Sequence, residues 1–541
     1  MTAAGDLVLV DGEVHTLTEP DTTHEALAVR DGAIVRVGRT DEIEHLVGVE
    51  TDVIDCEGRV VLPGFIDAHT HLESLGRYLV HADCSAATTL DEAIEALREQ
   101  AATDHEWILG FGYDESEWPT SRYPTREDLD RVSTDRPVVA MRVDMHTASL
   151  NSVAFERLAD DLPDADVRTE AGEPTGVVVE SATEVVWEAI DPGYAETREL
   201  VTAAIDHATS LGVTCVHEKV RHSQAPRIYR DLELAGALDC RVRIDYWSDH
   251  LESVIDAGLV TNSGSAMVTV GGIKSFTDGS LGARTAKLAE AYADATGSDG
   301  DGEPSGAYGN GDESSTADDD VDQSETDHEN RGQWVVTPDE LREIARRASE
   351  HDLQLTVHAI GDEAIDETLT VLEGVPNVAT ARHRIEHVEL ATDDHLKRMA
   401  EHGIVASMQP NFHQWAGEGS LYDERLGERW RETNRLRDVL DAGVPLAFGS
   451  DCMPLDPLLG VHHAVTAPTA SQRLSVTEAL QAYTAGAAYA GFDEDRLGTI
   501  EVGTRADLVV LERSPWEHPD EIDEIEVSKT LVDGRVVYDG R

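Results

Sequence analysis

The 541-residue chain carries 107 acidic and 43 basic residues, which gives a formal net charge of −64. Its length suits a large α/β barrel with insertions plus a smaller domain better than one ordinary compact core. The charge repels phosphate groups and so excludes nucleic acid as a partner. No apolar run reaches the roughly 18 to 20 residues of a membrane-spanning helix, so a membrane partner is excluded as well.

The acidic residues are spread along the chain. Segment 297–330, which is rich in Gly, Ser and Asp, holds only 12 of the 107 acids, and the chain uses five lysines against 38 arginines. A surface of this kind repels itself in dilute buffer, and concentrated salt screens the repulsion. We therefore expect a halophilic protein. Segment 297–330 is expected to be a disordered loop, because its few apolar residues cannot offset the entropy of ordering.

The expected location is a reducing cytoplasm. The first residues lack the basic region of a signal peptide and begin directly with strand-like alternation. The cysteines are scattered and contain no C-x-x-C pair, which argues against a disulfide framework and against a thiolate zinc site. They are Cys56, Cys84, Cys215, Cys240 and Cys452.

Both ends of the chain have the pattern of short β-strands. Residues 1–60 alternate and turn, as in "DLVLVDGEVHTL", and residues 491–541 do the same in "VSKTLVDGRVVYDG". We expect the two ends to pair into one small β-domain. Between them, residues 61–490 alternate strand-like and helix-like runs, the pattern of βα units. The clearest helix is predicted over 337–352, where Thr337, Pro338 and Glu340 form a capping signature.

The stretch "VLPGFIDAHTHLE" (61–73) ends a predicted strand in His69 and His71. Side chains two residues apart on a strand point to the same face, and two converging imidazoles suit a metal ion. Taken alone, the pair is equally well explained as two structural histidines that form hydrogen bonds. The remaining motifs of the chain have to decide between these readings.

The regions 73–135 and 151–198 are predicted to be long loops at strand ends. Between them, "VDMHTASLN" contains His146, which either lines a pocket or forms a hydrogen bond at the rim. Aromatic residues in the predicted loop 73–135 and in segment 411–422 either shape an apolar pocket or pack within a lid over the site. They are Trp118, Tyr123, Trp415 and Tyr422.

After residue 200, polar residues stand where successive strand-like runs end. The carboxyl ends of parallel barrel strands meet at one rim, and catalytic residues collect there. Each residue alone also has a structural explanation, such as a buried histidine, a turn aspartate or an ion pair between Lys274 and Asp278. Together they favour one site. They are His217 and Glu218, Lys274, His358, His387 and Asp451.

These motifs resemble the amidohydrolase superfamily of metal-dependent hydrolases. "PGFIDAHTHLE", "VHAIGD", "IEH", "FGSD" and "GTIEVGTRADLVVL" match its hallmarks in order and cover nearly the whole chain. "IKSFTDGSLGARTA" and "WILGFGYDES" are similar to one branch, amidohydrolase family 3, which includes proteins similar to N-substituted formamide deformylase. The resemblance implies a distorted (β/α)₈ TIM barrel, a small β-sandwich built from both chain termini, and often a homodimer.

The resemblance also implies one or two divalent metal ions, usually zinc, with manganese or iron as alternatives. Carried over by position, His69 and His71 bind a first ion, and His358 and His387 bind a second. Asp451 binds the first ion and acts as the base. Lys274 stands where many members carry a carboxylated lysine that bridges two ions. More strand-like runs precede Lys274 than a barrel needs, so Glu218 remains a rival bridging ligand, and His217 and His146 remain candidate pocket residues.

The expected function is hydrolysis of a non-peptide carbon–nitrogen bond (amide, formamide or cyclic amide) in a small molecule by a metal-activated water. Two alternatives stay open: a metal-dependent isomerase or decarboxylase on the same fold, and a catalytically silent binding protein. The substrate is not predicted, because loops at the strand ends set it.

Overall fold

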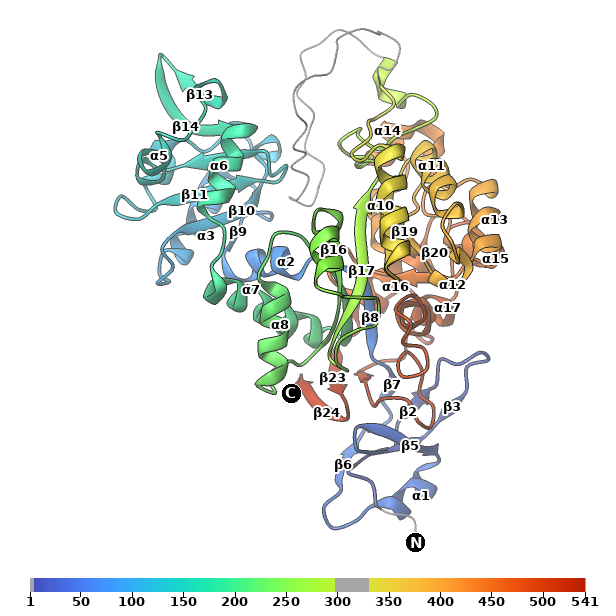
Figure 1. Ribbon diagram of the computed structural model, residues 1–541. Helices are drawn as coiled ribbons and strands as arrows, with labels where there is room; N and C mark the ends of the chain where they lie inside the picture. The colour runs from blue at the N-terminus through green and yellow to red at the C-terminus, as the bar shows by residue number, and fades with distance from the viewer. Residues whose placement is uncertain (1–3, 297–329, 541) are drawn as a thin grey trace. The chain divides into compact units, whose positions relative to one another are not determined.

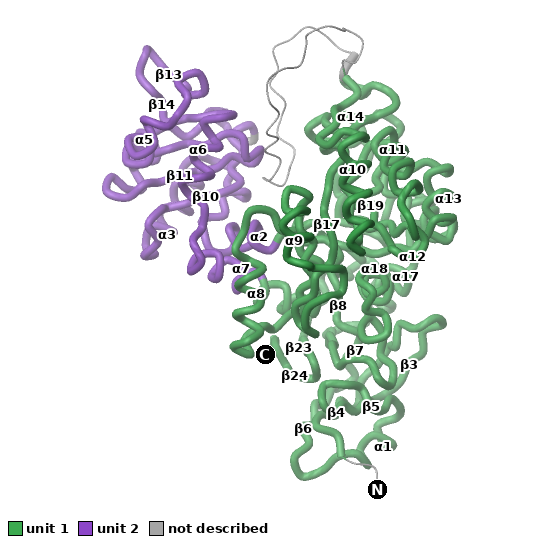
Figure 2. Tube along the Cα trace, viewed as in Figure 1, with its two compact units in different colours: residues 1–71, 205–297, 328–541 green, residues 72–204, 298–327 purple. Residues whose placement is uncertain are grey.

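The computed structural model describes residues 4–296 and 330–540. The acidic segment predicted to be a loop therefore lies, except for Asn330, outside the described residues. The chain forms two compact units, which Figure 2 colours separately. One contains the described parts of residues 1–71, 205–297 and 328–541, and the other contains residues 72–204.

An eight-stranded parallel sheet forms the centre of the first unit, and its strands are neighbours in the order in which they occur along the chain. The nearly closed sheet confirms the predicted barrel. Consecutive strands pair directly because each βα crossover returns the chain beside the strand that it has just left. The strands are β8 (Phe65–Thr70), β15 (Val213–Val220), β16 (Arg241–Trp247), β17 (Val268–Phe276), β18 (Gln354–Ala359), β19 (Arg384–His387), β20 (Val405–Met408) and β21 (Leu446–Phe448).

Helices follow the barrel strands, and those after β17 to β20 are labelled in Figure 1. The predicted helix 337–352 is confirmed as α10 (Pro338–Glu350). Thr337 is its N-cap, and the reciprocal hydrogen bonds of a capping box join Thr337 to Glu340. The other helices of this unit are α8 (Ala225–Leu234), α9 (Leu251–Asp256), α11 (Asp362–Glu373), α12 (Val378–Ala381), α13 (Asp393–His402), α14 (Leu421–Leu426), α15 (Leu436–Asp441), α16 (Pro457–Thr466), α17 (Val476–Gln481) and α18 (Ala487–Ala490).

A β-sandwich built from both termini confirms the second part of the fold prediction. Its six-stranded sheet interleaves the ends of the chain in the order β24–β23–β22–β7–β2–β3, and its four-stranded sheet has the order β5–β4–β1–β6. The strands are β1 (Leu7–Val10), β2 (Glu13–His15), β3 (Thr23–His24), β4 (Ala26–Arg30), β5 (Ala33–Gly38), β6 (Asp52–Asp55), β7 (Val60–Pro63), β22 (Leu508–Leu511), β23 (Val527–Val532) and β24 (Arg535–Asp539), with the short helix α1 (Thr40–Ile43).

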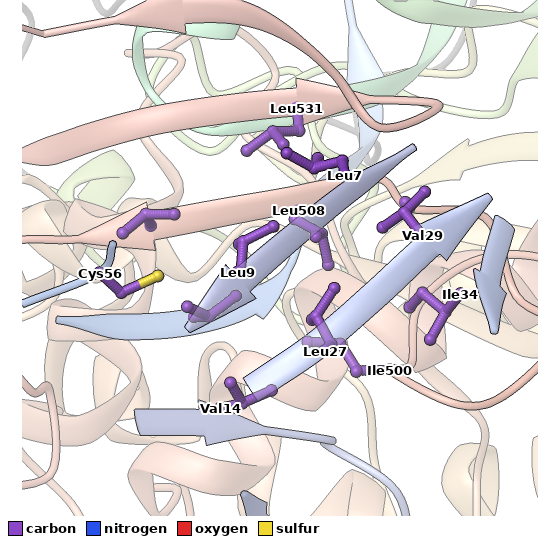
Figure 3. Packing of buried hydrophobic residues seen from close by; sticks show 13 residues of the cluster. Leu7, Leu9, Val14, Leu27, Val29, Ile34, Cys56, Ile500, Leu508 and Leu531 are labelled. Carbon is purple, nitrogen blue, oxygen red and sulfur yellow. The ribbon is translucent and has the colours of Figure 1, made fainter. Parts of the chain in front are cut away.

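The core of the sandwich joins residues that are about as far apart in the sequence as the chain allows. Leu7 and Leu27, from the N-terminal strands, pack with Leu508 and Leu531, from the C-terminal strands (Figure 3). Strand alternation places these apolar residues on the inner faces of the two sheets. Burying this surface is what requires both ends of the chain to fold together.

The second unit corrects one expectation. Residues 73–135 and 151–198 are not long loops, because they contribute β9, β10, β13 and β14 to a six-stranded sheet with the order β13–β14–β12–β11–β10–β9, whose remaining strands β11 and β12 lie between the two ranges. Apolar side chains of β10 and β11, such as Phe111 and Met141, bury each other in a separate core. The strands are β9 (Ala82–Asp83), β10 (Ile108–Tyr113), β11 (Val138–Arg142), β12 (Thr147–Leu150), β13 (Val167–Glu170) and β14 (Glu173–Val179).

The helices of residues 72–204 are short, apart from α7, which continues into the first unit. They are α2 (Leu72–Val80), α3 (Leu90–Gln100), α4 (Arg126–Leu129), α5 (Ser152–Leu158), α6 (Ser181–Ala189) and α7 (Tyr194–Ser210). Trp118 is buried in this unit and packs in its core with Tyr123, which matches the packing role considered for these two residues.

No helix of the described chain is both long enough and apolar enough to cross a membrane.

Candidate metal centre

Histidine and aspartate side chains from four barrel strands meet at the carboxyl edge of the barrel. The Nε2 atoms of His69 and His71 lie 3.6 Å and 3.3 Å from Oδ1 of Asp451. The ring of His387 lies 5.1 Å from that of His69 and 4.5 Å from that of His358, measured between centroids. The structure thus brings together these five predicted ligand residues, although 382 residues separate the first from the last.

Three of these residues meet the spacing that a metal ion requires. One ligand atom each from His69, His387 and Asp451 lie within 4.8 Å of one another, and all three side chains are buried. Imidazole nitrogens combined with a carboxylate oxygen form the donor set of zinc and related divalent ions. The residues present therefore fit a divalent metal ion.

The backbone at two of the candidate ligands is left-handed. His387 and the following Val388 have φ values of 75° and 54°, and Asp451 and Cys452 have φ values of 58° and 55°. Such angles are unfavourable for residues other than glycine, above all for a β-branched valine. Strain of this kind persists only where the surrounding structure imposes it, and it concentrates at functional sites. The turns direct the His387 and Asp451 side chains as the chain leaves β19 and β21.

Each of three histidines has one ring nitrogen held by a protein oxygen. Nδ1 of His69 lies 2.6 Å from Oε2 of Glu386, and Nδ1 of His387 lies 2.7 Å from Oε1 of Gln409. Nε2 of His358 lies 3.1 Å from the carbonyl oxygen of Gly279. A ligating histidine ordinarily donates its second nitrogen to such an acceptor. The arrangement leaves Nε2 of His69, Nε2 of His387 and Nδ1 of His358 for a ligand.

Burial keeps these imidazoles neutral. It lowers the pKa of His387 to about 3, and the positive charge of Lys274 acts in the same direction. The pKa of His69 is likewise well below its usual value, first because of burial and second because of Lys274. A neutral imidazole has the free lone pair that a metal ion needs, so no proton has to leave these two residues at neutral pH.

Lys274 lies in β17, the fourth barrel strand, and is 1% exposed. Its Nζ is 4.5 Å from the centroid of Phe276, whose ring lies 5.0 Å from that of His358. Burial lowers the pKa of Lys274 to about 8. Asp278, the partner considered above, instead accepts hydrogen bonds from backbone N–H groups, including that of Gly361 at 2.8 Å. Across residues 4–296 and 330–540, no ion pair to Lys274 is present.

The remaining candidates lie elsewhere. Glu218, on the second barrel strand, accepts a hydrogen bond from the Thr70 hydroxyl at 2.8 Å and is outside the His/Asp cluster. His217 is buried, and its Nδ1 lies 2.8 Å from Nη1 of Arg384, so it takes part in a hydrogen-bonded network. His146 belongs to residues 72–204. Its carbonyl oxygen accepts hydrogen bonds from the backbone N–H of Glu180, which precedes α6, and from the hydroxyl of Thr183 in α6.

The two aromatic residues after β20 pack with neighbours. Trp415 lies 4.8 Å from Phe412, between ring centroids, and 6.1 Å from Tyr422. Phe412 in turn stacks parallel to His387 at 6.0 Å with an interplanar angle of 5°. The ring of Phe412 therefore covers one face of the candidate ligand His387. Tyr422 is buried in a hydrophobic cluster that also contains Leu426 of α14.

Three residues that hold the candidate ligands were not predicted from the sequence: Arg384, Glu386 and Gln409. Arg384 and Glu386 are fully buried in β19, and the charges of Arg384 and Lys219 hold the pKa of Glu386 well below its usual value although burial opposes this. A signal was present: two charged residues at i and i+2 of a strand that ends in a candidate ligand share one face. Charges on a buried face need partners or a function.

The sequence is similar to known amidohydrolases over almost its whole length. A sequence model of the family described as "Amidohydrolase family" matches residues 52–538. The "Putative amidohydrolase YtcJ" of Bacillus subtilis is 29% identical over 557 residues and covers 98% of both chains. The "N-substituted formamide deformylase" of Arthrobacter pascens is 27% identical over 575 residues, covering 100% of this chain and 99% of its own.

Two solved structures titled as metal-dependent hydrolases are similar to this chain in both fold and sequence. A crystal structure titled as an uncharacterized metal-dependent hydrolase from Pyrococcus furiosus is 30% identical, with a TM-score of 0.77, and the alignment covers 94% of this chain and 99% of that chain. A second, from Pyrococcus horikoshii, is 28% identical with the same TM-score and covers 94% and 98%.

Proposed function

Because the chain belongs to the amidohydrolase family, we propose that it is a metal-dependent hydrolase that cleaves a non-peptide carbon–nitrogen bond in a small molecule. The observation that carries the proposal is the buried cluster of His69, His387 and Asp451, whose ligand atoms lie within 4.8 Å of one another. The bond type is supported by the similarity to a formamide deformylase across the whole chain. Fold alone would not support it, since one fold hosts many reactions.

The residues that would hold metal are those at the strand ends. His69, His71 and Asp451 would hold a first ion, most simply zinc, with manganese or iron as alternatives, and His358 and His387 a second. When bound, such an ion supplies a Lewis acid that lowers the pKa of water from 15.7 toward about 7. His69 and His387, whose pKa values are lowered by burial, and Asp451, whose pKa is lowered by the neighbouring His69 and His71 although burial opposes this, are already in the protonation states that binding needs.

Asp451 is the residue placed to move the proton. Its Oδ1 faces the Nε2 atoms of His69 and His71 in a buried site. In the proposed reaction this carboxylate takes a proton from the attacking water and then gives it to the leaving nitrogen. One group thus acts first as the base and then as the acid. Burial helps, because a proton held on Asp451 is not exchanged with bulk water during turnover.

Lys274 is proposed to act as a carbamate. Its Nζ would lose one proton to become the free amine, bond to the carbon of CO₂ and release a second proton, so that a buried cation becomes an anion with two oxygen atoms able to bind metal. The change of two charge units equals the charge that one divalent ion adds to the same buried site, so the modification and the ion compensate each other. A carbon-13 NMR carbamate signal after growth or incubation with labelled bicarbonate, absent in Lys274→Met, is expected. An active enzyme without that signal would reject the bridge.

The function is tested with a panel of N-substituted formamides, cyclic amides and carbamates, assayed in molar salt with zinc or manganese and ¹⁸O-labelled water. Hydrolysis requires one solvent oxygen in the acyl product. Turnover without label would assign the protein to the isomerases or decarboxylases of this fold. A protein that takes up metal but turns over nothing in the panel would favour a binding role. Metal-to-protein stoichiometry on the same sample separates one ion from two.

A further inference from the structure

Glu386 has no part in the proposed reaction, yet it makes a shorter contact to a candidate ligand than any other residue described above. Its Oε2 lies 2.6 Å from Nδ1 of His69, and both side chains are almost completely buried. The neighbour of His387 is different in kind, because Gln409 is a neutral amide. His69 therefore has a carboxylate at 2.6 Å, whereas Oδ1 of Asp278 lies 3.5 Å from Nε2 of His358, farther away than the Gly279 carbonyl oxygen.

Glu386 is itself held in place. Nε and Nη2 of Arg384 lie 2.9 Å and 3.2 Å from its two carboxylate oxygens. The guanidinium group is fixed in turn by the carbonyl oxygen of Ala68 at 2.6 Å, the hydroxyl of Ser407 at 2.8 Å and Nδ1 of His217 at 2.8 Å. These partners come from β8, β15 and β20, so the planar fork of Arg384 ties the carboxylate to three other strands of the barrel.

We propose that Arg384 and Glu386 form a positioning pair that keeps the proton of His69 on Nδ1 and presents Nε2 to a metal ion. This rests on the proposed metal-dependent function and deepens it. A carboxylate acceptor fixes the ring orientation and increases the electron donation of the imidazole, which strengthens the metal bond. The guanidinium keeps that carboxylate from rotating or leaving. Neither residue reaches the reacting atoms; both act through His69.

The test measures metal affinity without any substrate. Apoprotein is titrated with cobalt(II), whose visible spectrum reports the ligand geometry, against a competing chelator. Glu386→Asp keeps the charge and the partner of Arg384 but shortens the side chain by one methylene, so it should lose contact with Nδ1. The expected result is a loss of cobalt affinity of about 10- to 100-fold, together with a changed spectrum.

Removing Glu386 alone would leave Arg384 as an uncompensated buried charge and could unfold the protein. The double variant Arg384→Gln/Glu386→Gln removes both charges and should lose affinity in the same range. Its matched control is Arg241→Gln/Asp507→Asn, which removes another buried ion pair, one between barrel strand β16 and the residue before β22, with a 2.6 Å contact. The control should lower thermal stability while leaving the cobalt affinity and spectrum unchanged.

Wild-type affinity and spectrum in Glu386→Asp would overturn the proposal. So would equal losses in the two double variants, because loss of any buried pair would then suffice. Failure of the proposed function has a different signature: the wild-type apoprotein would bind no cobalt. If the wild type and the variants differ in cobalt affinity as predicted but the wild type turns over no substrate, the positioning role of Arg384 and Glu386 is still supported.

Discussion

The backbone N–H of Asp451 donates to the carbonyl oxygen of His69 at 2.9 Å, which joins the end of the last barrel strand to the end of the first. The neighbouring N–H of Ser450 donates to Oδ1 of Asp67 at 2.9 Å. The same few bonds therefore close the barrel and set the distance between two candidate metal ligands. Closure of the barrel and the geometry of the site therefore depend on the same contacts.

Gly449 makes this closure sterically feasible. A Cβ at that position would lie 2.5 Å from the backbone nitrogen and 2.8 Å from the Cβ of His69. Gly449→Ala must therefore push β21 away from β8. Overpacking of this kind costs about 1–3 kcal/mol of unfolding free energy. We also expect weaker metal binding, because the distance between His69 and Asp451 grows. Denaturant unfolding and cobalt titration measure the two effects.

The control for this substitution is Gly193→Ala. Within the described residues nothing lies within 4 Å of the place where its Cβ would stand. It should keep wild-type metal affinity and be neutral or more stable by about 0.4–1 kcal/mol, because alanine reduces the entropy of the unfolded chain. If Gly449→Ala behaves like Gly193→Ala in both measurements, the link between closure and the site is wrong.

Asp451→Asn separates proton transfer from metal binding. The amide keeps an oxygen in place of Oδ1 but is a poor base, so the turnover number should fall by about 10²- to 10⁴-fold. Metal content, measured by elemental analysis after dialysis, should stay near that of the wild type because the histidine ligands are intact. A variant that retains full activity would remove Asp451 from its role as the base.

Much of the barrel was predictable because parallel strands carry their functional residues at one end. His358 and His387 could be placed at the ends of neighbouring strands from apolar runs 29 residues apart, about one βα repeat. Pairing of the two chain ends in one sandwich followed from their shared strand pattern. These are local signals, because the periodicity of a short segment can be recognised without knowing its contacts with the rest of the chain.

Other features depend on contacts that a single sequence does not record. Among the strand-like runs that precede Lys274, only the structure shows that β10 and β11 leave the barrel for a second sheet while β15 and β16 remain. An apolar run says that a strand is buried but not against which partner. The contact of Glu386 with His69 spans 317 residues and likewise required the folded chain.

His383 predicts a pH dependence of stability. Burial lowers its pKa to about 4, and its Nδ1 accepts the N–H of Leu355 at 3.0 Å, which requires the neutral ring. The unfolded state, with a pKa near 6.5, binds the proton more readily. Stability is therefore complete above about pH 6.5 and falls as the pH drops toward 4; this one group contributes a loss of about 2 kcal/mol between pH 7 and pH 5.

The measurement compares unfolding free energies of the wild type and His383→Gln at pH 7 and pH 5 in the same molar salt. The variant should lose less stability on acidification, and the difference isolates His383 from other buried histidines. His222→Gln, at a side chain that is 69% exposed, serves as the control and should follow the wild type. Parallel curves for all three proteins would show that His383 contributes nothing to the pH dependence.

The net charge of −64 predicts that the protein needs salt. Between about 0.1 M and about 1 M salt the screening length falls from about 10 Å to about 3 Å, which removes most repulsion between exposed carboxylates. Surface ion pairs such as Arg346–Glu343 weaken as well, but each is worth little, and acids outnumber bases 107 to 43. The midpoint of thermal unfolding in KCl should therefore rise steeply over this range and then level off.

A variant with fewer exposed carboxylates distinguishes screening from other effects of salt. Five exposed acids of residues 72–204 suit conversion to the corresponding amides: Glu156, Asp160, Asp161, Glu184 and Glu188. Because the variant has less charge to screen, its midpoint should be higher than that of the wild type at low salt, and the two should converge at high salt. A wild-type midpoint that stays flat or falls with KCl would contradict salt adaptation. A constant offset between the two proteins at every concentration would contradict it as well, since an offset caused by repulsion among the five extra carboxylates must shrink as salt screens them.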